Sequence, residues 1–175
     1  MRPDIDPVFG LLATAAVSLL MAAAGVAKLR DLTRFSAVLE GYAVLPPALV
    51  PLIARLLPAL EVAIAIGLIW PVTRNGAAWA AGGLLFIYGA GLGLNLARGR
   101  RDLDCGCEGF GRRHPIAAWM LVRNALMIGL AALAGAPASA RAIEATDALT
   151  IAGGLAAFAL VYFAADELLG QRTPV

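Results

Sequence analysis

The sequence is poor in the residue types on which soluble enzymes depend most. Only 15% of its 175 residues are charged, whereas roughly a quarter are charged in an ordinary soluble domain. This low charge content excludes an ordinary soluble globular protein. One histidine and two cysteines leave little material for a metal site, and two cysteines are too few for a disulfide-stapled scaffold. The formal net charge is only +2, and the sequence has no stripe of basic residues with interleaved aromatics. These two features exclude nucleic acid as a partner.

Hydrophobic residues make up 61% of the chain and gather into long runs. A run of about twenty apolar residues is long enough to cross the hydrocarbon core of a bilayer. The pattern predicts an all-α fold: a polytopic transmembrane helical bundle in the lipid bilayer, with a four-helix core and a fifth span. We expect a single membrane domain over residues 1–175, with spans at about 8–26, 48–70, 77–97, 116–135 and 148–165.

The first run has a competing interpretation as a secretory signal, because residues 22–25 resemble a cleavage site. Asp4 and Asp6 cancel the positive leader charge that such signals need, and the run is long for a signal core. These features favour a membrane span.

Residues 29–45 differ from the spans because charged residues interrupt the apolar ones. Apolar side chains such as Leu32, Phe35 and Tyr42 recur at three- and four-residue steps, which predicts an amphipathic helix at the membrane interface. Pro46 and Pro47 are expected to end it, since proline removes a backbone donor.

Both cysteines lie in a hydrophilic loop at 98–115, as Cys105-Gly106-Cys107. A disulfide between cysteines one residue apart closes a small strained ring, and strain makes a disulfide easier to reduce. We therefore interpret Cys105 and Cys107 as a redox-active pair. Two alternatives stay open: a metal site that adds His114 and Glu108, and a pair of cysteines with no chemistry.

Several polar residues lie within the predicted spans, where burial is costly and usually functional. They fall in the half of the bilayer on the cysteine side or at its middle, and we expect a polar pocket from Lys28, Arg55, Glu61, Asn95, Arg123 and Asn124. Arg55 and Glu61 are six residues apart, about 240° around a helix, so Glu61 is expected to pair with Lys28 or Arg123 instead. Arg55 and Arg123 have an alternative in snorkelling to the interface.

The positive residues are distributed unevenly between the two sides of the membrane. With five spans, the side that holds the cysteine loop carries more of them than the side that holds Arg2, Arg74 and Arg141. The positive-inside rule then places the cysteine loop in the cytoplasm.

The segment from Gly99 to Gly109, which contains Cys-Gly-Cys, resembles the methylamine-utilisation protein family MauE, grouped with DoxX-like membrane proteins. Similar positions follow at Pro115-Ile116 and at residues 121–124, and the resemblance extends back to Leu60-Glu61 in the second span. The resemblance covers most of the chain up to about Gly135, and the Cys-Gly-Cys loop is its most specific part.

The resemblance implies a bacterial inner-membrane, multi-pass protein that supports maturation of a methylamine dehydrogenase-type periplasmic enzyme. It implies a thioredoxin-like partner of the MauD type and a role toward the small, disulfide-rich subunit of that enzyme. A periplasmic partner conflicts with the charge bias, so the side of the membrane stays open.

The expected activity is thiol–disulfide exchange by Cys105 and Cys107 through a mixed disulfide. A single pair needs a mobile acceptor, either a quinone as cofactor or the partner protein itself. The alternatives are a non-catalytic membrane scaffold or chaperone and a bundle that handles small solutes or lipids, with incidental cysteines in both cases.

Overall fold

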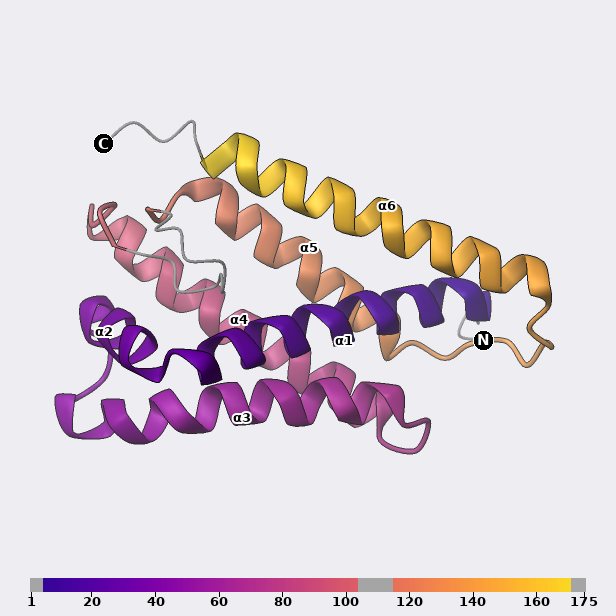
Figure 1. Ribbon diagram of the computed structural model, residues 1–175, viewed down its shortest axis with the longest axis horizontal. Coiled ribbons are helices and arrows are strands. Elements are labelled where there is room, and N and C mark those ends of the chain that lie inside the picture. The colour runs from indigo at the N-terminus through magenta and orange to yellow at the C-terminus, as the bar shows by residue number, and fades with distance from the viewer. Residues whose placement is uncertain (1–4, 104–114, 171–175) are drawn as a thin grey trace.

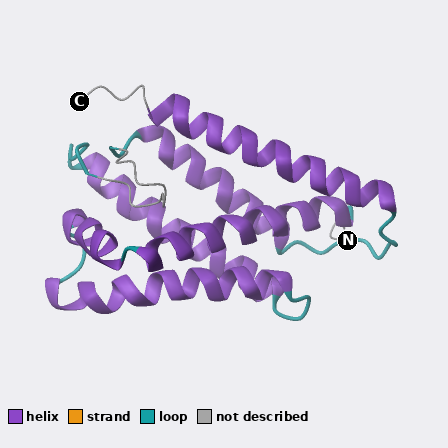
Figure 2. Cartoon of the chain, in the orientation of Figure 1, coloured by secondary structure: helices purple, strands orange, loops and turns teal. Residues whose placement is uncertain are grey.

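The structure, a computed structural model, describes residues 5–103 and 115–170 of the chain. Helices make up most of the described part, with loops between them and an isolated bridge between Ile5 and Ala138 (Figure 2). The prediction of an all-α, polytopic helical bundle is confirmed. The elements are α1 (Pro7–Arg30), α2 (Leu32–Tyr42), the 3₁₀ turn η1 (Pro47–Leu49), α3 (Val50–Ile69), α4 (Arg74–Ala97), α5 (Ala118–Ala134) and α6 (Ala145–Gly170).

In the part of the chain that the structure describes, four helical stretches are long and apolar enough to cross a membrane, namely 7–30, 47–69, 74–97 and 145–165. The helix at the expected fourth span, α5, has 17 residues. At 1.5 Å per residue it is about 25 Å long, a little short of the roughly 30 Å hydrocarbon core. These lengths describe a multi-pass membrane protein.

Helix α1 lies at the centre of the bundle (Figure 1). It packs against α3, α5 and α6, while α4 packs against α3 and α5. The main core joins Val17 and Met21 of α1 to Leu68 of α3, and Ala81 of α4 to Ala131 of α5. Large apolar side chains on the outer faces, among them Phe86 and Leu160, remain exposed. Exposed apolar faces suit a surface surrounded by lipid.

The close approach of α1 and α3 depends on Gly25. A Cβ atom built at Gly25 would lie 2.9 Å from the Pro58 carbonyl oxygen and 2.9 Å from Val62 Cγ2. Both distances are shorter than a side chain tolerates, so only glycine allows this crossing. Small residues at a helix crossing are the usual way for membrane helices to approach each other.

Two features differ from the expected spans at the end of the bundle drawn on the left in Figure 1. Helix α1 runs four residues past the expected end of the first span, so that Lys28 belongs to α1. The helix expected over 29–45 is α2, which is shorter and begins after Asp31, whose side chain accepts a hydrogen bond from Arg34 N–H. This capping bond explains the break between α1 and α2.

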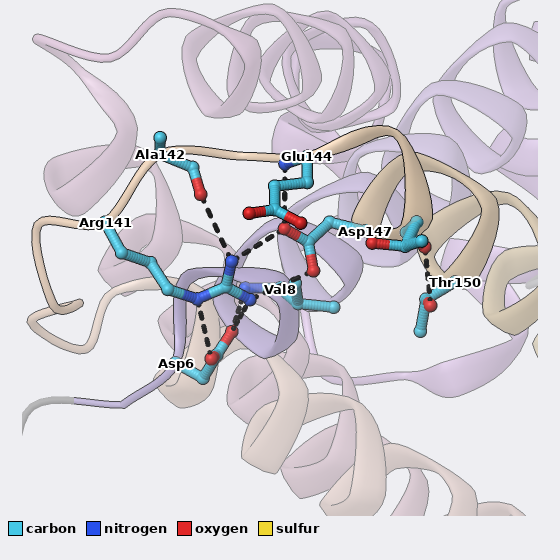
Figure 3. Close-up of polar contacts among 8 residues, drawn as sticks. Asp6, Val8, Arg141, Ala142, Glu144, Asp147 and Thr150 are labelled. Atoms are coloured by element: carbon cyan, nitrogen blue, oxygen red, sulfur yellow. Dashed lines mark hydrogen bonds and ion pairs between the residues drawn. The ribbon is translucent and has the colours of Figure 1, made fainter.

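At the opposite end of the bundle, Arg141 forms ion pairs that connect two helices (Figure 3). Its guanidinium donates to Asp6, the N-cap of α1, at 2.9 Å and to Asp147 in the first turn of α6 at 2.6 Å. The Arg141 guanidinium, together with the Val8 N–H, lowers the pKa of Asp6. The hydrogen bond to Asp147 raises the pKa of Arg141 most, and the hydrogen bond to Asp6 raises it further. These contacts connect the start of α1 to the start of α6.

Candidate functional site

Cys105 and Cys107 lie outside the described residues, but the two ends of their loop are defined. Ile116 N–H donates to the Leu103 carbonyl oxygen at 2.9 Å, so the loop starts and ends at a hydrogen-bonded pair. Leu103 and Ile116 pack in a second apolar cluster with Leu92, Met120 and Tyr42. The loop therefore arises from a packed base formed by α2, α4 and α5.

An ion pair is buried inside the bundle beside this end. Lys28 of α1 is 7% exposed and Glu61 of α3 is 0% exposed. Lys28 Nζ donates to Glu61 Oε1, and the hydroxyl of Tyr88 on α4 donates to the same oxygen at 2.8 Å. Of the two partners expected for Glu61, the structure selects Lys28. Gly25 explains how the pair meets, since it lets α1 pack directly on the backbone of α3 beside Glu61.

Two aromatic rings surround the Lys28 ammonium. Lys28 Nζ lies 4.6 Å from the ring centre of Tyr88 and 5.2 Å from that of Phe35, distances at which a cation is attracted to the face of a ring. Phe35 is the buried residue of α2, so the ammonium joins α1 to α2, α3 and α4. We call Lys28, Glu61, Tyr88 and Phe35 the buried ion-pair site.

A second buried polar residue, Asn95 of α4, lies nearer to the cysteine loop. It is 0% exposed, and its amide nitrogen donates to the carbonyl oxygens of Tyr42 at 3.2 Å and Gly91 at 3.0 Å. Its amide oxygen accepts a hydrogen bond from Arg100 at 3.4 Å. Asn95 thus connects the end of α2 to the chain that leads into the cysteine loop.

The other residues of the expected polar pocket do not join the ion pair. Arg55 is exposed on α3. The Arg123 guanidinium lies over the rings of Trp119 and Tyr162, at 5.1 and 5.6 Å, between α5 and α6. Asn124 lies against Gly89 of α4, its amide nitrogen 3.2 Å from the position of a Cβ there. The expected pocket is therefore divided into a Lys28–Glu61 site, an Asn95 junction and an Arg123 stack.

Sequence reasoning missed Tyr88 and Phe35. Aromatic residues are common in spans and amphipathic helices, so neither stands out by composition. A signal was available in Tyr88, because a buried tyrosine hydroxyl needs a hydrogen-bond partner and Glu61 lies at a similar predicted depth.

No group of three or more His, Cys, Asp or Glu side chains that could hold a metal ion occurs in the described part of the chain. The metal alternative raised for Cys105, Cys107, Glu108 and His114 falls on the loop outside it.

Comparison with known proteins identifies the family. A profile described as methylamine utilisation protein MauE matches residues 6–137. The methylamine utilization protein MauE of Paracoccus denitrificans is 35% identical over 156 residues, covering 88% of this chain and 83% of that protein. The MauE of Methylophilus methylotrophus is 34% identical over 171 residues, covering 94% of this chain and 88% of that protein. No solved structure matches the chain. The chain therefore belongs to the MauE family.

Proposed function

We propose that this protein is an accessory membrane protein of methylamine utilisation that exchanges electrons between Cys105-Gly106-Cys107 and a thioredoxin-like partner of the MauD type. Membership of the MauE family supports the pathway, because the similar proteins are named for methylamine utilisation. The proposed location is the bacterial inner membrane. The proposed client is the small, disulfide-rich subunit of a methylamine dehydrogenase-type periplasmic enzyme.

The observation that best supports the thiol chemistry is the packing at the two ends of the cysteine loop. Cys105 follows Leu103 by two residues, and Leu103 is hydrogen-bonded to Ile116 on the other side of the loop. A reactive pair gains from a rigid support, because exchange requires the attacking and leaving sulfurs to line up. The packed base under the loop supplies such a support.

The proposed exchange balances without an external oxidant. A thiolate of one cysteine attacks the partner's disulfide, which forms a mixed disulfide and releases one partner thiolate. The second cysteine then attacks the mixed disulfide, and the partner leaves as a dithiol while Cys105 and Cys107 become joined. Return to the dithiol needs a reductant, which is another protein dithiol. In the opposite direction the Cys105–Cys107 disulfide oxidises a dithiol of the partner, and the two electrons then pass from the Cys105–Cys107 dithiol to a quinone-class carrier.

Trapping tests the proposal directly. Cys107→Ser and Cys105→Ser variants, expressed with the thioredoxin-like partner, are separated on non-reducing gels. Exchange predicts that one of the two variants accumulates a reductant-sensitive adduct with the partner, and that Cys105→Ser/Cys107→Ser accumulates none. If neither single variant forms an adduct and the double variant supports full enzyme maturation, the protein is a scaffold or a solute- or lipid-handling bundle instead.

A further inference from the structure

The hydrogen bonds of the buried ion-pair site fall on one side of the Glu61 carboxylate. Lys28 Nζ and the Tyr88 hydroxyl both donate to Oε1. Among the described residues Oε2 has no hydrogen-bond partner, although the side chain is 0% exposed. A charged oxygen without a donor is among the most costly groups to bury in a membrane protein. An ion pair that served only to hold the fold would be expected to satisfy both oxygens.

The packing beside Glu61 limits what could bind there. A Cβ at Gly25 would lie 3.1 Å from Glu61 Cβ and 2.9 Å from the Pro58 carbonyl oxygen, so on the α1 side not even a methyl group fits. A proton is the one ligand of a carboxylate that needs no space. Protonation also removes the charge that makes the unpartnered oxygen costly, since a neutral carboxyl is much cheaper to bury.

The surroundings of Lys28 suit a carboxylate that changes its charge. When Glu61 is neutral, Lys28 needs another source of stabilisation to remain an ammonium. The faces of Phe35 and Tyr88 supply it, because the attraction of a cation to a ring does not depend on Glu61. Lys28 Nζ also donates to the Tyr88 hydroxyl at 3.5 Å, so this hydroxyl contacts both charged groups.

We propose that Glu61 is a buried proton-binding site, which takes up and releases a proton while Lys28 keeps its charge. In the described residues the titratable or charged groups that face it are Lys28 from α1 and Tyr88 from α4, while α2 contributes the uncharged ring of Phe35. The exchange is a simple balance: the carboxylate plus one proton gives the carboxylic acid. This inference goes beyond thiol exchange and does not depend on it.

Infrared difference spectroscopy of the full protein in lipid nanodiscs, titrated with acid, tests the proposal without an activity assay. We expect a carbonyl stretch of a protonated carboxylic acid to grow as the pH falls, to shift to lower frequency in D₂O, and to be lost in Glu61→Gln. The exposed Glu144 provides the matched control, and Glu144→Gln should keep the band. A spectrum that is the same in wild type and Glu61→Gln at every pH where both are folded would show a fixed ion pair and overturn the proposal.

Two further variants report on the same band and leave Glu61 in place. Tyr88→Phe keeps the ring but removes a hydrogen bond to the carboxyl group, so the carbonyl stretch of the protonated acid should move to higher frequency. Phe35→Leu removes one of the two rings beside the Lys28 ammonium, which changes the electrostatic surroundings of the carboxyl group and should shift the same band. A band whose frequency stays fixed in both variants would contradict the proposed site, because its two neighbours would then have no influence on the protonated carboxyl group.

Discussion

Breaking the buried ion pair from one side should be far more harmful than removing it completely. Lys28→Met leaves the Glu61 carboxylate without its cation, and Glu61→Leu leaves the Lys28 ammonium without its anion. Lys28→Met/Glu61→Leu replaces both charges with apolar side chains of similar volume. The three variants and the wild type form a thermodynamic cycle that measures the coupling between the two residues.

The burial of the two residues sets the magnitude. At 7% and 0% exposure the pair is screened little by solvent, so the values for buried rather than surface pairs apply. Each single variant should lower the free energy of unfolding by about 3–5 kcal/mol, while the double variant should lie within roughly 1–2 kcal/mol of wild type. The coupling energy then amounts to several kcal/mol, above the range of about 0.5–3 kcal/mol that is usual for neighbouring residues.

Reversible unfolding in mixed micelles, followed by circular dichroism, measures these free energies. The exposed Arg55 on α3 is the matched control, and Arg55→Met should change stability by less than about 0.5 kcal/mol. If the double variant loses as much stability as the sum of the single variants, the two charges are not coupled and the assigned pairing is wrong.

Three other features of the fold lead to predictions of their own. Gly25→Ala should push α1 away from α3 and cost about 1–3 kcal/mol, whereas Gly83→Ala, with open space around its Cβ, should be neutral or slightly stabilising in the same unfolding assay. Arg141→Ala should loosen the start of α6, seen as faster amide hydrogen exchange there and not in α3. In the wild type, Arg141 holds the pKa of Asp6 below its ordinary 3.8. The stability that this contact contributes is therefore present above about pH 4 and is lost as the pH falls through the lower pKa of the folded state. Arg141→Ala should abolish this part of the pH dependence of stability. Asn95→Leu removes the bonds to the end of α2 and should cost about 2 kcal/mol, with faster exchange in α2, and unchanged exchange there would refute the junction.

The fold could be predicted from the sequence to the extent that hydrophobic length determines it. Apolar runs of about twenty residues identify spans because an unpaired backbone group cannot face lipid, and α3 and α4 lie at the expected positions. The extension of α1 to Arg30 could not be predicted from composition. Lys28 and Arg30 resemble the polar end of a span, but Lys28 is buried against Glu61 inside the bundle.

The candidate site could be predicted in part. The depth of Glu61 indicated an interior residue with a cationic partner, and helix periodicity excluded Arg55. The choice between Lys28 and Arg123 depended on which helices adjoin α3, and this follows from the close contact at Gly25. Arg123 is instead held by Trp119 and Tyr162, on a face that meets α6. Sequence alone does not specify how helices pack side by side, so it could not distinguish these arrangements.

The most direct test of the proposed electron exchange is thiol labelling of Cys105 and Cys107 in intact cells, with a membrane-impermeant and a permeant maleimide, before and after mild reduction. Redox cycling of the pair predicts that part of the pool resists labelling until reductant is added. This part should shrink when the thioredoxin-like partner, whose disulfide joins Cys105 and Cys107 in the proposed exchange, is deleted. The impermeant reagent then reports the side of the membrane. Two cysteines that are fully and equally labelled under all of these conditions would contradict a redox-active pair.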